Sequence, residues 1–194
     1  MRKGALDLNG KQTNKMEEIK EYIKKKKLHY MILIETNIHG KKYQKIANQK
    51  YTKKEAEDAM TIEGFTIELS DAWEKYEVSR IVMYCDKNRL YKRLKPNNNE
   101  NDLQNVTIEI GKSKKFILTA CYREHTGGAS GMSNLESQKE RFTRQLKLWK
   151  GLQRRNEDTL IIGDANIDFR RLNDPNYKLT QLAEMLQDWM IEMT

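Results

Sequence analysis

An apolar run that ends at a glycine, with acidic and amide side chains directly after it, constrains this chain more than any other stretch. Residues 159–162 are Thr-Leu-Ile-Ile, a pattern that predicts a short buried strand. Gly163 follows and lets the backbone turn, and Asp164 and Asn166 come next. In open α/β sheets, ligands bind beyond the carboxyl ends of the strands. The stretch therefore predicts a polar site at a strand end.

Two other interpretations fit the same residues locally. A strand followed by an Asx-type turn would also place Asp164 and Asn166 here. A calcium loop is suggested because Asp164, Asn166 and Asp168 match its first three ligand positions. It fails further on, since Phe169 stands where glycine is needed and Pro175 where glutamate is needed. The turn and the site remain as alternatives.

Length and composition indicate one polar, globular domain spanning residues 1–194. Hydrophobic residues make up 38% of the chain and charged residues 33%, and no apolar run approaches the roughly 18 residues of a membrane span. The first residues lack the apolar stretch of a secretory signal. Cys85 and Cys121 lie inside apolar runs without metal-type spacing, so we expect buried thiols in a reducing, intracellular compartment and no membrane partner.

The formal net charge of +8 favours a polyanionic partner. Part of this excess comes from the lysine run at residues 24–27. That run is also compatible with the solvated end of a helix, so charge alone leaves nucleic-acid binding open.

Hydrophobic periodicity predicts alternating helices and strands along the whole chain. The predicted strands are residues 6–9, 30–34, 65–69, 78–85, 106–110, 116–121 and 159–162. The predicted helices are residues 15–26, a short one near 56–60, 138–152 and 178–190. A hairpin turn is expected at residues 111–115, and a polar loop at residues 95–102.

Several of these strands end in polar residues of related chemistry. They are Asp7 and Asn9, Glu35, Tyr122 with Arg123, and Asp164 with Asn166. Each has an ordinary alternative, such as a frayed terminus, a turn cap or a strand-end aromatic. Carboxylate and amide oxygens suit a hard cation such as Mg²⁺, and a carboxylate near a metal-polarised phosphate can orient or deprotonate water. Any one of these positions is weak evidence for a site, and their occurrence together in this order is much stronger.

In this order the residues resemble the motifs of the endonuclease/exonuclease/phosphatase superfamily. The likeness runs from Leu6 to Thr194 and is nearest to the apurinic/apyrimidinic-endonuclease-like domains of non-LTR retrotransposons. Asp7-Leu-Asn-Gly10 is similar to the first motif, with Asp7 where the family usually has Asn. Glu35-Thr36 is similar to the Glu-Thr signature, and Gly163-Asp-Ala-Asn166 to Gly-Asp-x-Asn.

The resemblance implies roles for each of these residues. Glu35 is implied as the principal ligand of Mg²⁺ or Mn²⁺, with Asn9 beside it. Asp164 would orient or activate the attacking water, and Asn166 would bind phosphate. Tyr122 would contact the scissile phosphate or stabilise the site. Substrate contacts are assigned to Asp7 and Arg123.

The implied fold is α/β, a four-layer αββα sandwich, and the implied activity is metal-dependent cleavage of DNA. A retroelement enzyme of this kind would act in the nucleus with a fused or downstream reverse transcriptase. The alternatives are a phosphatase of the same superfamily and a non-catalytic, basic nucleic-acid-binding remnant.

Two departures from the family pattern lower the expected activity. Val78-Ser-Arg80 replaces the Gly-Gly that often precedes the middle strand. The Ser-Asp-His motif is absent, because His29, His39 and His125 lie in other contexts. We therefore expect a domain that lacks its C-terminal strands and hydrolyses DNA poorly, since losing one member of a catalytic unit commonly costs orders of magnitude in rate.

Overall fold

The computed structural model describes residues 15–39, 53–95, 102–123, 135–153, 158–168 and 180–192, and the elements below lie within these ranges. The helices are α1 (Lys15–Lys26), α2 (Lys53–Ala59), α3 (Ala72–Tyr76), α4 (Leu135–Gln153) and α5 (Gln181–Glu192). The strands are β1 (Tyr30–His39), β2 (Phe65–Leu69), β3 (Val78–Asp86), β4 (Tyr91–Leu94), β5 (Asn105–Ile110), β6 (Phe116–Tyr122) and β7 (Asp158–Asp164).

The strands form two sheets of mixed α/β character. One sheet has the order β1-β3-β2 and is antiparallel throughout. The other has the order β4-β5-β6-β7, and only its β6–β7 pair is parallel. Helix α4 links β6 to β7, because a parallel pair needs a crossover connection. Both strands therefore end at the same edge of their sheet.

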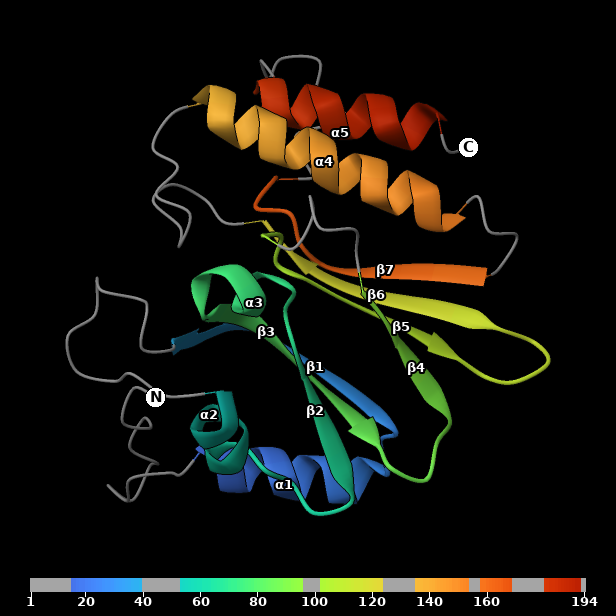
Figure 1. Ribbon diagram of the computed structural model, residues 1–194. Coiled ribbons are helices and arrows are strands. Elements are labelled where there is room, and N and C mark those ends of the chain that lie inside the picture. Colours follow the sequence, from blue (N-terminus) through green and yellow to red (C-terminus); the bar gives the residue numbers. More distant parts are fainter. Residues whose placement is uncertain are drawn as a thin grey trace.

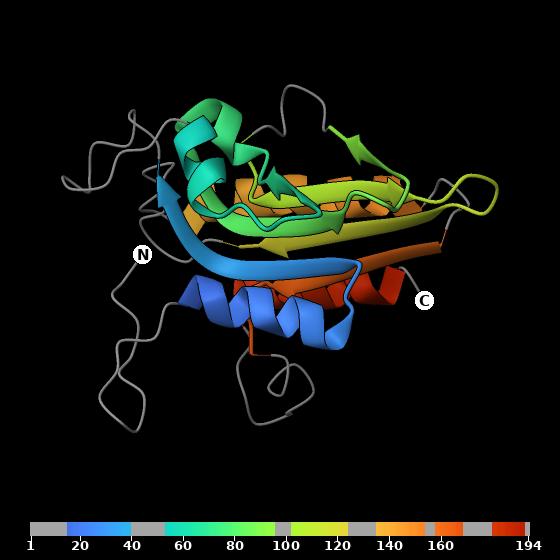
Figure 2. The ribbon, with the colours of Figure 1, turned by 90° about the horizontal axis from the view of Figure 1, so that it is seen from below.

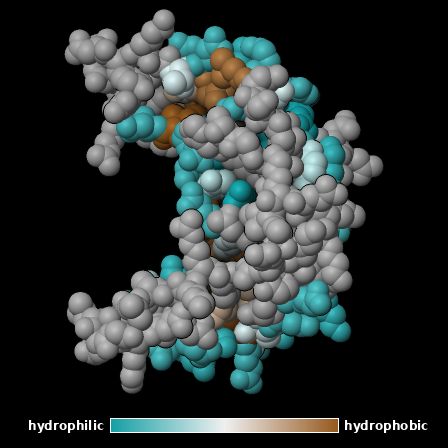
Figure 3. All heavy atoms as spheres, turned by 90° about the vertical axis from the view of Figure 1, so that its left-hand side faces the viewer, coloured by the Kyte–Doolittle hydropathy of each residue, from teal (hydrophilic) through white to brown (hydrophobic). Residues whose placement is uncertain are grey.

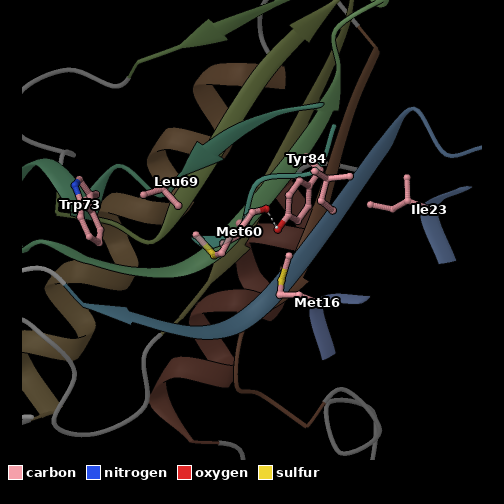
Figure 4. Packing of buried hydrophobic residues seen from close by; sticks show 8 residues of the cluster. Met16, Ile23, Met60, Leu69, Trp73 and Tyr84 are labelled. Carbon is pink, nitrogen blue, oxygen red and sulfur yellow. Dashed lines mark hydrogen bonds between the residues drawn. The ribbon is translucent and has the colours of Figure 1, made fainter. Parts of the chain in front are cut away.

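Three apolar clusters hold the helices and sheets together. Helix α1 packs on one face of the first sheet, where Met16 and Ile23 meet Tyr84, whose hydroxyl donates to the Met60 carbonyl at 3.0 Å (Figure 4). The two sheets meet through residues such as Ile81 of β3 and Val106 of β5. Helices α4 and α5 cover the far face of the second sheet (Figures 1 and 2).

Alternation of side chains along β3 explains how one strand serves two of these clusters. Ile81, Met83 and Cys85 face the second sheet, whereas Val82 and Tyr84 face α1. Both faces of β3 are covered, which explains why the strand is apolar along most of its length. Cys85 and Cys121 are free and buried, as predicted.

The structure corrects the sequence prediction at several elements. Residues 72–76 and 91–94 were not assigned, yet they form the short helix α3 and the strand β4. The strand predicted at residues 159–162 exists, but Leu160 and Ile162 are 45% and 40% exposed. Their neighbours across the ladder, Leu118 and Ala120, face the first sheet. The prediction of burial was wrong because β7 lies at the sheet edge among the described strands.

Within the described ranges, no helix is long and apolar enough to cross a membrane. The predicted strand at residues 6–9, which carries Asp7 and Asn9, lies outside these ranges.

Candidate active site

The parallel pair β6–β7 brings Tyr122 and Asp164 side by side. The two residues are register partners at the last step of the ladder. The Arg123 amide then donates to the Asp164 carbonyl at 2.8 Å, and the Tyr122 amide donates to the Gln104 carbonyl at 2.9 Å. These bonds fix the ends of both strands, so the Tyr122 and Asp164 side chains start from neighbouring backbone positions.

Gly163 makes this close pairing possible. A Cβ atom at this position would lie 1.9 Å from the Cys121 carbonyl oxygen and 2.5 Å from the Cys121 Sγ. No side chain fits at these distances, and the nearest atom belongs to the backbone. The glycine before Asp164 is therefore required by the contact between the strands. The turn that the sequence suggested at Gly163 is wrong, because Gly163 lies inside β7 and its φ is not positive.

Beyond β7, a tight turn holds Asn166 against the end of β6. The Asp164 carboxylate Oδ1 accepts the Asn166 amide at 2.7 Å, the pattern of an Asx turn. Asn166 has a φ of 52°, a left-handed conformation that asparagine tolerates better than most residues. Its side-chain amide donates to the Arg123 carbonyl. The Asx turn, one of the two alternatives that the sequence left open, is therefore present.

The Arg123 side chain stabilises this turn through hydrogen bonds to its backbone. Its side chain is 8% exposed, and its guanidinium donates to the carbonyls of Ala165 and Asn166, the second at 2.7 Å. The guanidinium also lies over the Phe142 ring of α4, 5.8 Å from the centroid. The sequence predicts a substrate contact for Arg123; in the structure its guanidinium is buried and bonds the backbone of the turn.

Glu35, on β1 of the first sheet, contacts Tyr122 of the second sheet. The β1–β3 register shifts between Ile34 and Ile38, so Glu35 lies in a bulge within the strand, whereas the sequence suggested that the strand ended before it. Glu35 has a φ of 60°, which is costly for a glutamate, on the order of 1–3 kcal/mol. Its carboxylate Oε1 accepts the Tyr122 hydroxyl at 3.3 Å.

Glu35, Tyr122, Asp164 and Asn166 therefore come together from β1, β6 and the segment at the end of β7. Figure 3 looks onto this end of the molecule, and hydrophilic residues lie in the middle of the face. The strained backbone at Glu35 interrupts the regular pairing of β1 with β3. In this conformation the exposed Glu35 carboxylate lies against the Tyr122 hydroxyl.

The surroundings keep Tyr122 protonated. Burial raises the pKa of the Tyr122 hydroxyl, and the Glu35 carboxylate raises it further, while a hydrogen bond with Asn166 and the charge of Arg80 lower it in part. The net direction is upward, so the hydroxyl is a hydrogen-bond donor at neutral pH. Burial also raises the pKa of the Cys121 thiol to about 12, with the Asp164 charge adding to the effect, so this thiol is neutral.

Arg80 is a residue at this site that the sequence interpretation passed over. It stands on β3 between Ser79, which pairs with Ile38, and Ile81, which pairs with Ile34. It therefore faces the bulge that carries Glu35. Its amide donates to the Gln104 Oε1 at 2.9 Å. The signal available in the sequence was a lone arginine in front of the apolar run of β3.

The described residues fit a magnesium ion held mainly by water and phosphate. Mg²⁺ is usually bound through one or two carboxylates, with waters and substrate phosphates completing its shell. Glu35 supplies one exposed carboxylate. Within the part of the chain that the structure describes, no three His, Cys, Asp or Glu side chains gather as a metal cage. Asn9 and Asp7, the other predicted contacts, lie outside that part.

Comparison with known proteins adds no family assignment. No protein-family model matches the sequence, and no curated protein matches it significantly.

Proposed function

We propose that this chain is a metal-dependent phosphodiesterase domain that cleaves DNA. The observation that carries the proposal is the contact of Glu35 with Tyr122, whose register partner is Asp164. Three segments far apart in the sequence thus gather the carboxylate, phenol and amide groups that the family resemblance names. The two facing sheets, with α1 outside one and α4 and α5 outside the other, support the four-layer sandwich that belongs to this proposal.

Each side chain has a distinct task in this proposal. The Asp164 carboxylate orients the attacking water and accepts its proton. The neutral Tyr122 hydroxyl and the Asn166 amide donate hydrogen bonds to phosphate oxygens. Glu35 holds the Mg²⁺ or Mn²⁺ ion, which when bound stabilises negative charge on the phosphate. Arg123 and Gly163 keep Asp164 and Asn166 in place through the contacts described above.

Turnover is expected to be slow. The histidine whose side chain is described, His29, hydrogen-bonds Asp86 at the other end of β1, so it does not reach the phosphate. The Ser-Asp-His motif is also absent from the sequence, so we expect the charge that develops on phosphorus to be stabilised by fewer groups than in the family pattern. Nuclear location and association with a reverse transcriptase follow only from the retroelement resemblance and form part of the same proposal.

Conversion of supercoiled plasmid to nicked circles, with protein in excess, tests the proposal. We expect slow nicking that needs Mg²⁺ and falls about 100-fold or more in Asp164→Asn, the usual loss for a removed general base. The matched control is Asp188→Asn, an exposed carboxylate on α5, which should nick at the wild-type rate. Equal nicking by Asp164→Asn and Asp188→Asn would refute the assignment. A phosphatase would instead release phosphate from small esters and leave the plasmid intact.

Binding of nucleic acid without cleavage is the second candidate function. It is favoured by the net charge of +8, which suits a polyanionic partner. Plasmid binding that persists in EDTA, with no nicking when Mg²⁺ is added, would favour this candidate over both enzymes.

A further inference from the structure

Three connections meet at the end of the molecule opposite the candidate site. The Asp86 amide, at the end of β3, donates to the His29 carbonyl at 2.8 Å, which joins the α1–β1 and β3–β4 connections. The Gly111 amide in the β5–β6 hairpin donates to the Leu90 carbonyl at 3.4 Å. In Figures 1 and 2 these connections lie at the right-hand end, whereas β1, β6 and β7 run toward the left.

This end is rich in exposed cations. We call it the basic end and define it by Lys24, Lys25, Lys26, Lys27, Lys87, Arg89 and Lys112. Elsewhere on α1, Lys20 pairs with Glu17 at 2.8 Å. In the described part of the chain, the six lysines of the basic end form no such ion pair. Their charges are therefore available to a ligand.

Arg89 keeps its charge although it has a partner. Its Nη2 donates to the His29 Nε2 at 2.8 Å, so that ring nitrogen is the acceptor. The other nitrogen, Nδ1, then carries the proton and donates to the Asp86 Oδ2 at 2.9 Å. The imidazole thus orients the guanidinium. Arg89 is held in a defined position beside Lys87.

The basic end is too far from Glu35 to belong to the same site. Glu35 follows Tyr30 by five residue steps along β1, about 17 Å at the usual rise of an extended strand. Lys24, Lys25 and Lys26 form the last turn of α1, and Lys27, Lys87 and Lys112 lie in the connections at this end. A group that binds them does not touch the Tyr122–Glu35 pair.

We propose that the basic end binds the phosphodiester backbone of a nucleic acid, as a surface separate from the candidate site. Closely spaced, unpaired lysines with one oriented arginine match a chain of phosphates, each with one negative charge. A membrane surface would demand an apolar face beside the charges. Helix α1 turns its Met16 and Ile23 inward instead, and the exposed large hydrophobic residues next to these charges in the chain are Tyr22 and Leu90, one from each of two segments. The nucleic-acid choice rests on the proposed function, which makes DNA the substrate.

Fluorescence anisotropy with a short labelled duplex DNA, in EDTA and over about 50–200 mM salt, tests this inference. The basic-end variant combines Lys24→Gln, Lys26→Gln and Lys87→Gln. The matched control combines Lys139→Gln, Lys147→Gln and Lys150→Gln on α4, which removes the same charge from the other side of the molecule. Thermal melts show that both variants are folded. A single-stranded RNA probe, measured in the same way, shows whether the basic end binds DNA or RNA more tightly.

We expect the slope of log affinity against log salt to become shallower by about 2 to 3 in the basic-end variant, because each lost phosphate contact contributes about 0.9. The control variant should keep the wild-type slope. Equal slopes in the two variants would overturn the inference. Polyglutamate serves as a polyanion without phosphates. If the basic-end variant loses binding to polyglutamate but binds DNA as the wild type does, the inference is also overturned. Cleavage plays no part in EDTA, so failure of the nicking assay leaves this result standing.

Discussion

Replacing Gly163 with alanine places a methyl group inside the ladder between β6 and β7. The new Cβ atom would lie 1.9 Å from the Cys121 carbonyl oxygen and 2.7 Å from its carbonyl carbon. Contacts this short cannot be relieved by rotating a side chain, because both atoms belong to the backbone. The strands must separate at the step that sets Asp164 beside Tyr122.

The expected cost is at the upper end of the range for overpacking, about 3 kcal/mol. For a chain of this length, each kcal/mol lowers the melting temperature by about 2–4 °C, so a loss of about 6–12 °C is expected. Nicking should fall as well, because Asp164 moves with the strand.

Thermal unfolding monitored by circular dichroism measures this effect. Gly151→Ala is the matched control, since a Cβ atom at Gly151 meets nothing within 4 Å and the position is helical. Alanine there should stabilise the protein by about 1 kcal/mol. The double variant Gly163→Ala/Cys121→Ala separates the two contacts, because it removes the Sγ and leaves the carbonyl. We expect it to recover none of the stability lost in Gly163→Ala.

A melting temperature of Gly163→Ala within about 2 °C of wild type would refute the argument, since it would mean a cost of 1 kcal/mol or less. Full recovery in the double variant would show that the thiol, and not the backbone, is the obstacle.

Three further predictions concern a helix end, an ion pair and the candidate site. Lys27 ends α1 with a φ of 52°, and the Leu28 amide donates to the Ile23 carbonyl, so Lys27→Gly should stabilise the protein by about 1 kcal/mol in urea unfolding. Burial raises the pKa of the Asp102 carboxyl, but its bidentate bond with Arg144 outweighs this and the net shift is downward. That stabilisation is present above the unfolded pKa of about 3.9 and is lost as the pH falls through the folded pKa. Arg144→Met should therefore cost about 3 kcal/mol at pH 7 and much less in acid, as compared by urea unfolding at both pH values. Tyr122→Phe removes the hydroxyl that donates to the Glu35 carboxylate, and the nicking rate should fall about 10- to 100-fold without loss of melting temperature.

Helices and strands whose hydrophobic residues recur with a clear period were predictable from sequence. Elements that depend on pairing with a neighbouring strand were not. The apolar stripe of α4 and the alternation in β2 follow from their own residues. The strand β4 is four residues long and is held by its register with β5, which its sequence does not encode. The exposure of Leu160 depends on where the first sheet stops, a property of the whole fold.

The same distinction applies to the candidate site. Asp164 and Asn166 were predictable because a glycine, a carboxylate and an amide follow an apolar run. Glu35 was found as a polar residue after an apolar run, but the bulge and its left-handed backbone were not foreseeable, since they arise from the register with β3. The burial of the Arg123 guanidinium against the turn could not be predicted, because it depends on how β6, β7 and α4 pack together.

A double-mutant cycle on Glu35 and Asp164, read as Mg²⁺-dependent plasmid nicking, tests most directly whether these residues act as one site. Glu35→Gln and Asp164→Asn should each reduce the rate about 100-fold, and the double variant should be no slower than the worse single variant, because removing one member disables the unit. Losses that multiply in the double variant, or a Glu35→Gln variant that nicks at the wild-type rate, would contradict a shared site.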